Sequence, residues 1–375
     1  MRAPVRVLPD EVANQIAAGE VVERPASVVR ELVENALDAA ARFVEVTVER
    51  GGRRRIRVTD DGHGMGREDA VLALDRHATS KIVSATDLRS VRSFGFRGEA
   101  LPSIAAVSRL RVETHDGSGP VGTLVRATGG RILEVADFPR RPGTTVEVQG
   151  LFFNAPARSA FLKSVAAEAR ACREALTSLA LANPGVRVLL VSDDRPLLDL
   201  PATSDLRERV ARLWGDEAAA TLLALPSAPA SDGPAGYAVL GLVQRPDAAG
   251  PGLRRGHLFV NGRPFRDAGV QAALDRGYRT TIPQGVRPWY LLFLHMPEGT
   301  VDVNVHPAKA EVRFQDRSAV EAMVERAVRR ALAGEESGAG LGQSPGRAPA
   351  PLAVAEPGRA WPDAAGGGGA AGTSA

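Results

Sequence analysis

The stretch Glu31-Leu32-Val33-Glu34-Asn35-Ala36-Leu37-Asp38-Ala39 decides how the rest of this sequence is interpreted. It predicts a helix, because successive helical residues are rotated by about 100° and the apolar positions then gather on one side. Glu31, Asn35 and Asp38 fall along one edge, and the remaining surface is apolar: Val29, Leu32, Val33, Ala36 and Ala40. A solvated polar face is the ordinary interpretation of such an edge. The neighbouring segments favour a functional one.

A strand and a glycine-containing turn follow. Residues 55–59 alternate polar and apolar side chains as a half-buried strand does, and the chain then breaks into Asp60-Asp61-Gly62-His63-Gly64. Two glycines spaced by one residue allow backbone to approach a ligand closely. An aspartate before such a turn can accept a hydrogen bond from an exocyclic amine. The alternative is a plain hairpin turn.

A third segment, residues 94–101 (FGFRGEAL), leads into a predicted apolar helix at residues 104–107. Glycines that run into a helix start present free N–H groups and the positive end of the helix dipole, which suits an anion. Glycine-rich loops are common, so this segment alone is a weak indication.

Taken in this order, the three segments resemble the GHKL ATPases and, within them, the MutL family of mismatch-repair proteins. The resemblance rests on the joint occurrence of six runs across residues 5–330: NQIAAGEVVERP (14–25), ELVENALDA (31–39), RHATSK (76–81), GFRGEAL (95–101), FNAPAR (153–158) and VDVNVHPAK (301–309). It implies an α+β fold: a GHKL (Bergerat-type) ATPase α/β sandwich, a second smaller α/β domain of the ribosomal-protein-like transducer type, and a disordered tail.

The domain boundaries follow from the resemblance and from composition. We expect the ATPase domain at 1–205, with a dimerisation arm at 1–22 and an ATP lid at 74–101. The transducer domain is expected at 206–333, ending in a helix from about 318 to 333. After Gly334 the sequence is rich in Gly, Ala, Pro and Ser, which cannot bury enough apolar surface to repay ordering, so 334–375 is predicted to be a flexible linker or tail.

The resemblance implies ATP hydrolysis with Mg²⁺. The P-loop pattern GxxxxGK[ST] is absent, so other residues must bind the nucleotide. Glu31 would be the general base, Asn35 would hold Mg²⁺, and Asp60 would accept the adenine amine. The full set of expected nucleotide-binding residues is Asn35, Asp38, Asp60, Gly62, Gly64, Thr79, Ser80, Lys81, Gly95, Phe96, Arg97, Gly98, Glu99, Ala100, Leu101, Thr144 and Lys309, the last reaching the γ-phosphate from the second domain.

The resemblance also implies partners. ATP would bring two copies together through the arm at residues 5–22, for which packing on its own domain is the alternative. DNA would then be bound independently of sequence, with Arg263 and Arg266 as the candidate contacts. A mismatch-recognition protein and a downstream nuclease or helicase are the other expected partners. The expected location is the cytoplasm, on the nucleoid when the protein is bound to DNA.

Composition limits other possibilities. The net charge is +3, from 47 Lys plus Arg against 44 Asp plus Glu, which is too little to indicate DNA binding by itself. Cys172 is the one cysteine, which excludes an internal disulfide and a cysteine-cluster metal site and predicts a small core residue. The six histidines are too scattered for a zinc site. No apolar run approaches the roughly 18 residues of a membrane span.

Two features depart from the family pattern. Asp61 stands where many relatives have asparagine, which adds a negative charge near the nucleotide. No acidic and histidine-rich endonuclease motif is present, so no nuclease activity is expected of these residues. Two alternative functions remain: another GHKL enzyme, such as a gyrase B subunit, and a nucleotide-gated DNA-binding module with incidental turnover. The first is not expected to carry FFNAPAR and VDVNVHPAK together.

Overall fold

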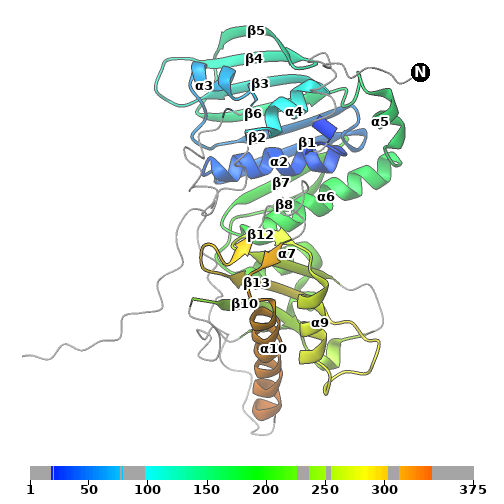
Figure 1. Ribbon diagram of the computed structural model, residues 1–375. Helices are drawn as coiled ribbons and strands as arrows, with labels where there is room; N and C mark the ends of the chain where they lie inside the picture. The colour runs from blue at the N-terminus through cyan, green and yellow to red at the C-terminus, as the bar shows by residue number, and fades with distance from the viewer. Residues whose placement is uncertain are drawn as a thin grey trace, which may run out of the picture.

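The computed structural model describes residues 18–19, 21–76, 78, 98–225, 236–250, 255–302 and 312–339, with backbone alone for 334–339. Two sheets organise these residues (Figure 1). The first has eight strands in the order β5-β4-β3-β6-β2-β1-β7-β8, and the second has five in the order β12-β11-β13-β10-β9. A short pair, β14-β15, completes the strands of the described residues.

The eight-stranded sheet is mostly antiparallel, with one parallel pairing between β1 and β7. Its strands are β1 (Phe43–Glu49), β2 (Arg55–Asp60), β3 (Arg109–His115), β4 (Gly122–Thr128), β5 (Arg131–Phe138), β6 (Gly143–Gln149), β7 (Arg187–Ser192) and β8 (Arg195–Leu200). The helical segments of this half are α2 (Pro25–Asp38), η1 (Arg50–Gly52), α3 (Arg67–Leu72), α4 (Ala100–Ala106), α5 (Pro156–Phe161) and α6 (Val165–Ala182).

Alternation along the strands explains why helices cover one face of this sheet. Val44, Val46 and Val48 on β1 are buried, and so are Ile56 and Val58 on the paired β2. The alternate residues of these strands face the other side of the sheet. There, charged pairs form between neighbouring strands, such as Arg55 with Glu49 and with Glu147. Side chains alternate between the faces of a strand, so the sheet has one apolar and one polar face.

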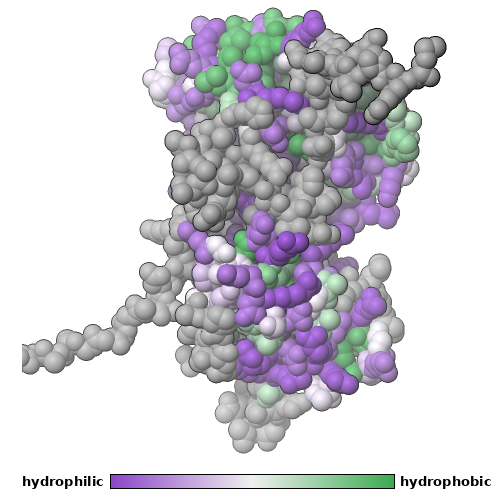
Figure 2. Space-filling view, in the orientation of Figure 1, coloured by the Kyte–Doolittle hydropathy of each residue, from purple (hydrophilic) through white to green (hydrophobic). Residues whose placement is uncertain are grey.

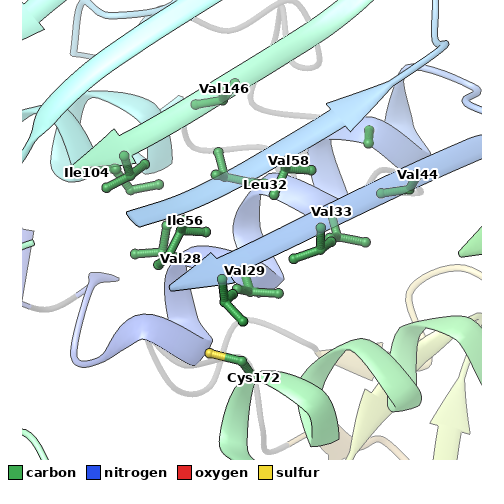
Figure 3. Packing of buried hydrophobic residues seen from close by; sticks show 14 of the residues in the cluster. Val28, Val29, Leu32, Val33, Val44, Ile56, Val58, Ile104, Val146 and Cys172 are labelled. Carbon is green, nitrogen blue, oxygen red and sulfur yellow. The ribbon is translucent and has the colours of Figure 1, made fainter. Parts of the chain in front are cut away.

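Helix α2 lies on the apolar face (Figure 3). Pro25 suits its first turn, where a backbone N–H has no helical partner. Val29, Leu32, Val33 and Ala36 are buried, as the sequence predicts. Ala40 is different: the helix ends at Asp38, and Ala40 is exposed with a φ of 57°. Cys172 of α6 is buried in the same core, which confirms that expectation.

The second half contains the five-stranded sheet and its helices. Its elements are α7 (Leu206–Trp214), α8 (Asp216–Ala220), β9 (Leu222–Ala224), β10 (Ala238–Gln244), η3 (Pro246–Ala248), β11 (Gly256–Val260), β12 (Arg263–Phe265), α9 (Ala268–Gly277), β13 (Tyr290–His295), β14 (Val301–Asp302), β15 (Arg313–Phe314) and α10 (Arg317–Ala339). Helices α9 and α10 pack on each other, and their apolar side chains join the strands in a separate core.

A third apolar cluster joins the two halves. Leu181 and Ala182 at the end of α6 pack with Leu206 of α7 and with strand residues of the second sheet, including Phe259 and Leu291. The second half is therefore in direct contact with the first, close to the end of a helix that packs on α2.

The helices and strand expected in residues 31–39, 55–59 and 104–107 are present as α2, β2 and α4, with different bounds. The last helix, α10, continues to Ala339 instead of ending near residue 333. Glutamate and alanine favour helix after residue 333, and Gly334 and Gly338 each cost only about 1 kcal/mol relative to alanine. At the far end of the first sheet, β5 carries the exposed Ile132 and Leu133, and Figure 2 shows a hydrophobic patch there.

Candidate nucleotide site

The polar edge of α2 begins the site. Glu31, Asn35 and Asp38 are partly buried on this edge, as the sequence predicts. Glu34 was not predicted to belong to this site, yet it is 4% exposed and is the most buried polar residue of the helix. Its position three residues after Glu31 places it beside the same edge, since residues three and four apart are neighbours on a helix. The edge thus carries three carboxylates and one amide.

Asp60 lies at the end of β2 with a buried carboxylate. Its Oδ1 accepts hydrogen bonds from the Gly62 N–H at 2.9 Å and from the Thr144 N–H at 3.3 Å. Within the described residues no hydrogen bond reaches Oδ2, so this oxygen is the one available to an external donor. Burial raises the pKa of Asp60, and the two backbone donors act in the opposite direction.

The Asp60 turn meets the C-terminal end of α2 at Ala39. The His63 N–H donates to the Ala39 carbonyl at 3.0 Å. A Cβ on Gly62 would lie 2.7 Å from that same oxygen, so only glycine fits this approach. The structure thereby brings the predicted adenine-binding turn directly against the predicted catalytic helix.

Gly64 and Thr144 belong to the same corner of the sheet. Gly64 has a φ of 66°, and a Cβ there would lie 1.9 Å from the His115 carbonyl oxygen. The Thr144 hydroxyl lies 3.0 Å from that of Thr114, which accepts a hydrogen bond from the Met65 N–H at 2.8 Å. Packing of the chain against itself is thus sufficient to explain the glycine at position 64.

The described ends of the expected lid lie together. Gly98 has a φ of 63°, and a Cβ there would lie 2.3 Å from the Ala78 carbonyl oxygen. Helix α4 begins at Ala100, earlier than predicted, so Gly98 and Glu99 precede the helix while Ala100 and Leu101 lie in its first turn. The other expected phosphate-binding residues lie outside the described residues: Thr79, Ser80, Lys81, Gly95, Phe96, Arg97 and Lys309.

Asp61 does not face the corner of Asp60. Its Oδ1 accepts the backbone N–H groups of Arg42 and Phe43, each at 2.8 Å. The carboxylate therefore fixes the start of β1. This is a structural use for the residue that departs from the family pattern.

The two candidate DNA contacts differ in exposure. Arg266 is exposed after β12. Arg263 is 8% exposed, and the carboxylates that act to raise its pKa, Glu34, Asp38 and Glu31, are on α2. This setting is unlike the open groove expected from the sequence, because a buried guanidinium presents almost no surface to a DNA phosphate. Arg266 remains the better candidate.

The short described part of the arm packs on its own domain. Ala18 and Val22 are fully buried in the core of the first half. Gly19 faces Arg158, because a Cβ on Gly19 would lie 1.9 Å from Arg158 Nη2. Two of the quoted motifs, NQIAAGEVVERP and FNAPAR, therefore meet in space. Residues 5–17, including Ile16 and Ala17, lie outside the described residues.

The donor atoms on α2 suit a hard cation. Carboxylate and amide oxygens are the ligands that Mg²⁺ prefers, and this ion commonly keeps several waters and binds substrate phosphates besides one or two protein oxygens. A single protein ligand such as Asn35 fits that chemistry. Among the residues that the structure describes, no group of three or more His, Cys, Asp or Glu is placed to hold a metal ion by itself.

Comparison with known families identifies both halves. The model described as "Histidine kinase-, DNA gyrase B-, and HSP90-like ATPase" matches residues 23–124, and the model described as "DNA mismatch repair protein, C-terminal domain" matches residues 210–333. These matches cover α2, the Asp60 turn and most of the second half.

Curated relatives and solved structures agree with the family models. The DNA mismatch repair protein MutL of Gemmatimonas aurantiaca is 52% identical over 340 residues, and that of Geotalea uraniireducens 46% over 332 residues. These alignments cover 90% and 88% of this chain and 55% and 54% of the relatives. The chain thus spans about half the length of these relatives.

Among solved structures, the Aquifex aeolicus MutL ATPase domain complexed with ADP is 30% identical with a TM-score of 0.54. That alignment covers 74% of this chain and 93% of the Aquifex chain. The N-terminal domain of a DNA repair protein has a TM-score of 0.71, with 87% of this chain and 99% of the other aligned, but at 24% identity it shows the fold alone.

The fold and the polar edge of α2 define a protein with a GHKL-type ATPase domain, and the predicted α+β architecture is confirmed. No helix of the described ranges is long and apolar enough to cross a membrane. The second domain, the relatives and the solved ATPase domain narrow the class further: the chain belongs to the MutL family of DNA mismatch repair proteins.

Proposed function

We propose that this chain binds ATP between α2 and the Asp60 turn and hydrolyses it during DNA mismatch repair. The observation that carries the proposal is the junction at Ala39, where the acidic helix edge meets a buried aspartate with one carboxylate oxygen turned toward no described donor. The bound ADP of the Aquifex relative supports the same ligand class.

In this proposal Asp60 Oδ2 accepts the adenine amine, while Gly62 and Thr144 hold the carboxylate in place through Oδ1. Asn35 holds Mg²⁺, which supplies charge neutralisation on the phosphates. Glu31, one turn away, takes the proton of the attacking water. One rigid helix then fixes the base relative to the phosphate, and phosphoryl transfer depends mostly on positioning and charge stabilisation.

The lid at residues 74–101 closes over the triphosphate, and its described parts meet at Ala78 and Gly98. Its proposed contacts are Thr79, Ser80, Lys81, Gly95, Phe96 and Arg97, with Lys309 reaching the γ-phosphate from the second domain. A contact from each domain makes their arrangement depend on whether ATP or ADP is bound.

ATP binding then brings two copies together through the arm at residues 5–22 and forms a clamp on DNA. Arg266 contributes to a sequence-independent contact with phosphates. The closed dimer acts as a matchmaker between a mismatch-recognition protein and a downstream nuclease or helicase. Slow hydrolysis resets the clamp.

Sedimentation of the chain with and without a non-hydrolysable ATP analogue tests the proposal. The analogue should shift the protein from monomer to dimer, and the Glu31→Ala variant should still dimerise while its hydrolysis falls by about 10²-fold or more. Unchanged hydrolysis by Glu31→Ala would reject the general base. A monomer at saturating analogue would reject the ATP-dependent dimer.

A second candidate is a nucleotide-gated DNA-binding module whose turnover is incidental. It is favoured by the same two-domain contact, because gating requires only that binding changes the domain arrangement. Comparing mismatch repair by the Glu31→Ala variant and by the parent distinguishes the two functions. If the variant supports repair as well as the parent does, hydrolysis is incidental.

A further inference from the structure

Arg263 occupies a rigid hairpin tip in the second domain. It is the first residue of β12, after the two-residue turn Asn261-Gly262, whose φ values are 48° and 82°. Such a pair of positive φ values is typical of tight hairpins. The Asn261 side chain fixes the turn, because Nδ2 donates to the Met296 carbonyl at 3.0 Å and Oδ1 accepts its N–H at 2.9 Å.

This hairpin reaches the first domain. Strand β12 packs against α6, and Figure 1 shows β12 at the junction of the two halves. The Arg263 side chain is 8% exposed there. Burial lowers its pKa, and the charges of Glu34, Asp38 and Glu31, in decreasing order of effect, raise it. The second domain therefore places a buried cation where it interacts electrostatically with the acidic edge of α2.

The three carboxylates lie close together on the helix surface. Relative to Glu31, the helical rotation places Asn35 about 40° to one side and Glu34 about 60° to the other, with Asp38 about 20° toward Glu34. The three charges that act on Arg263 therefore all lie on the same side of Asn35 around the helix. Glu31 is the carboxylate nearest to Asn35 around the helix.

A nearby cation would stabilise the acidic edge of α2. Three carboxylates within two turns repel one another, and Glu34 is almost completely buried. A buried charge is costly to fold unless it is paired. Arg263 supplies that charge from a different domain, through a hairpin whose own conformation is fixed.

We propose that Arg263 is a positioning residue for ATP hydrolysis, holding the acidic edge of α2, and with it Glu31, from the second domain. This inference rests on the proposed function. It makes the rate of the chemical step depend on the contact between the domains. Removal of the side chain should affect the orientation of the base more than the affinity for nucleotide, because no nucleotide-binding residue named above is replaced.

The test measures kcat and KM for ATP in the full chain without DNA. Arg263→Met keeps the apolar part of the side chain and should lower kcat about tenfold with KM changed less than about twofold. Arg263→Lys keeps the charge without the guanidinium and should retain at least about a third of the parent kcat. Arg287→Met replaces an exposed arginine of the same domain and should leave both constants unchanged.

A double variant separates positioning from stability. Arg263→Met leaves Glu34 buried without this cation, so the melting temperature should fall. Arg263→Met/Glu34→Gln removes that buried charge, and the melting temperature should recover. If the double variant also recovers the parent kcat, Arg263 only neutralises Glu34 and the positioning role is overturned. If kcat stays low in the recovered protein, the role is supported, even where Arg263→Met alone folds poorly.

The result also separates this inference from the proposed function. A parent chain that hydrolyses ATP beside an Arg263→Met variant with the same kcat would overturn only the positioning role. A parent chain that neither binds nor hydrolyses ATP would overturn the proposed function and the positioning role together.

Discussion

Asp60 and Thr144 are direct partners in the pairing of β2 with β6, and the Thr144 N–H donates to Asp60 Oδ1 at 3.3 Å. Burial raises the pKa of Asp60, so its charged form costs folding free energy at neutral pH. The Asp60 carboxylate therefore destabilises the fold, and its Oδ2 accepts no hydrogen bond from the described residues. We infer that this oxygen serves to bind a ligand.

Asp60→Asn tests this relationship. The amide oxygen can still accept from Gly62 and Thr144, so we expect the nucleotide-free protein to melt at the same or a higher temperature. ATP binding should be lost, because an NH₂ group then faces the adenine amine, and calorimetry should detect at least a hundredfold fall in affinity, on the order of 3 kcal/mol. Normal affinity would reject the adenine contact.

The neighbouring carboxylate is a matched control. Asp61→Asn keeps one oxygen for the Arg42 and Phe43 N–H groups and removes the charge. Since this carboxylate is engaged with the start of β1, ATP affinity should change less than about threefold, below 1 kcal/mol. A large gain in affinity would mean that the charge at position 61 does reach the triphosphate.

Gly64 should tolerate no side chain. Its φ of 66° disfavours other residues, and a Cβ would lie 1.9 Å from the His115 carbonyl oxygen. Gly64→Ala should therefore lower the free energy of unfolding by about 2 kcal/mol or more. Gly185→Ala is the control, because nothing lies within 4 Å of its Cβ position. Equal stability of the two variants in urea unfolding would contradict the packing argument.

Local patterns predicted the core of the first domain well. Alternating residues on β1 and β2 and the helical spacing on α2 are determined by neighbours in the sequence, and the structure buries Val44, Ile56 and Leu32 accordingly. The Asp60 turn was also predicted from its glycines. Its meeting with Ala39 was implied only by the family resemblance, because the contact joins residues that no local pattern connects.

What the sequence did not reveal are contacts between distant segments. Glu34 was passed over because a charged residue beside an exposed helix edge is usually solvated, and the sequence does not show which distant segments cover it. Arg263 was expected on the surface for the same reason. Strand β12 has only three residues, too few for alternation to identify it.

Arg266 remains the candidate DNA contact. It is exposed at the end of β12. Arg266→Glu should weaken binding to any duplex and reduce the slope of log K against log salt by about 1. Arg195→Glu, an exposed arginine on β8 of the first domain, makes the same charge change elsewhere. If both variants lower the slope equally, the effect reflects net charge and Arg266 makes no specific contact.

His257 should make stability depend on pH. Its ring is stacked on Phe259 at 6.3 Å and lies 5.8 Å from Trp214. Burial, assisted by Arg255 and Arg266, lowers its pKa from 6.5 to about 4. Between these values the unfolded chain binds a proton that the folded chain does not. The free energy of unfolding should therefore fall as pH decreases through this window, by about 3 kcal/mol in total.

His257→Phe removes the titrating group and keeps a ring that can stack on Phe259. Urea unfolding at several pH values between about 7 and 4 should show a flatter profile for this variant than for the parent. Arg266→Glu provides a second check. Loss of the repelling Arg266 cation should raise the pKa of folded His257 and so narrow the pH range between its folded and unfolded pKa values. When the pH is lowered from about 7 to 4, the free energy of unfolding should fall most for the parent, less for Arg266→Glu and least for His257→Phe. If the free energy of unfolding depends on pH in the same way in all three proteins, groups other than His257 determine that dependence.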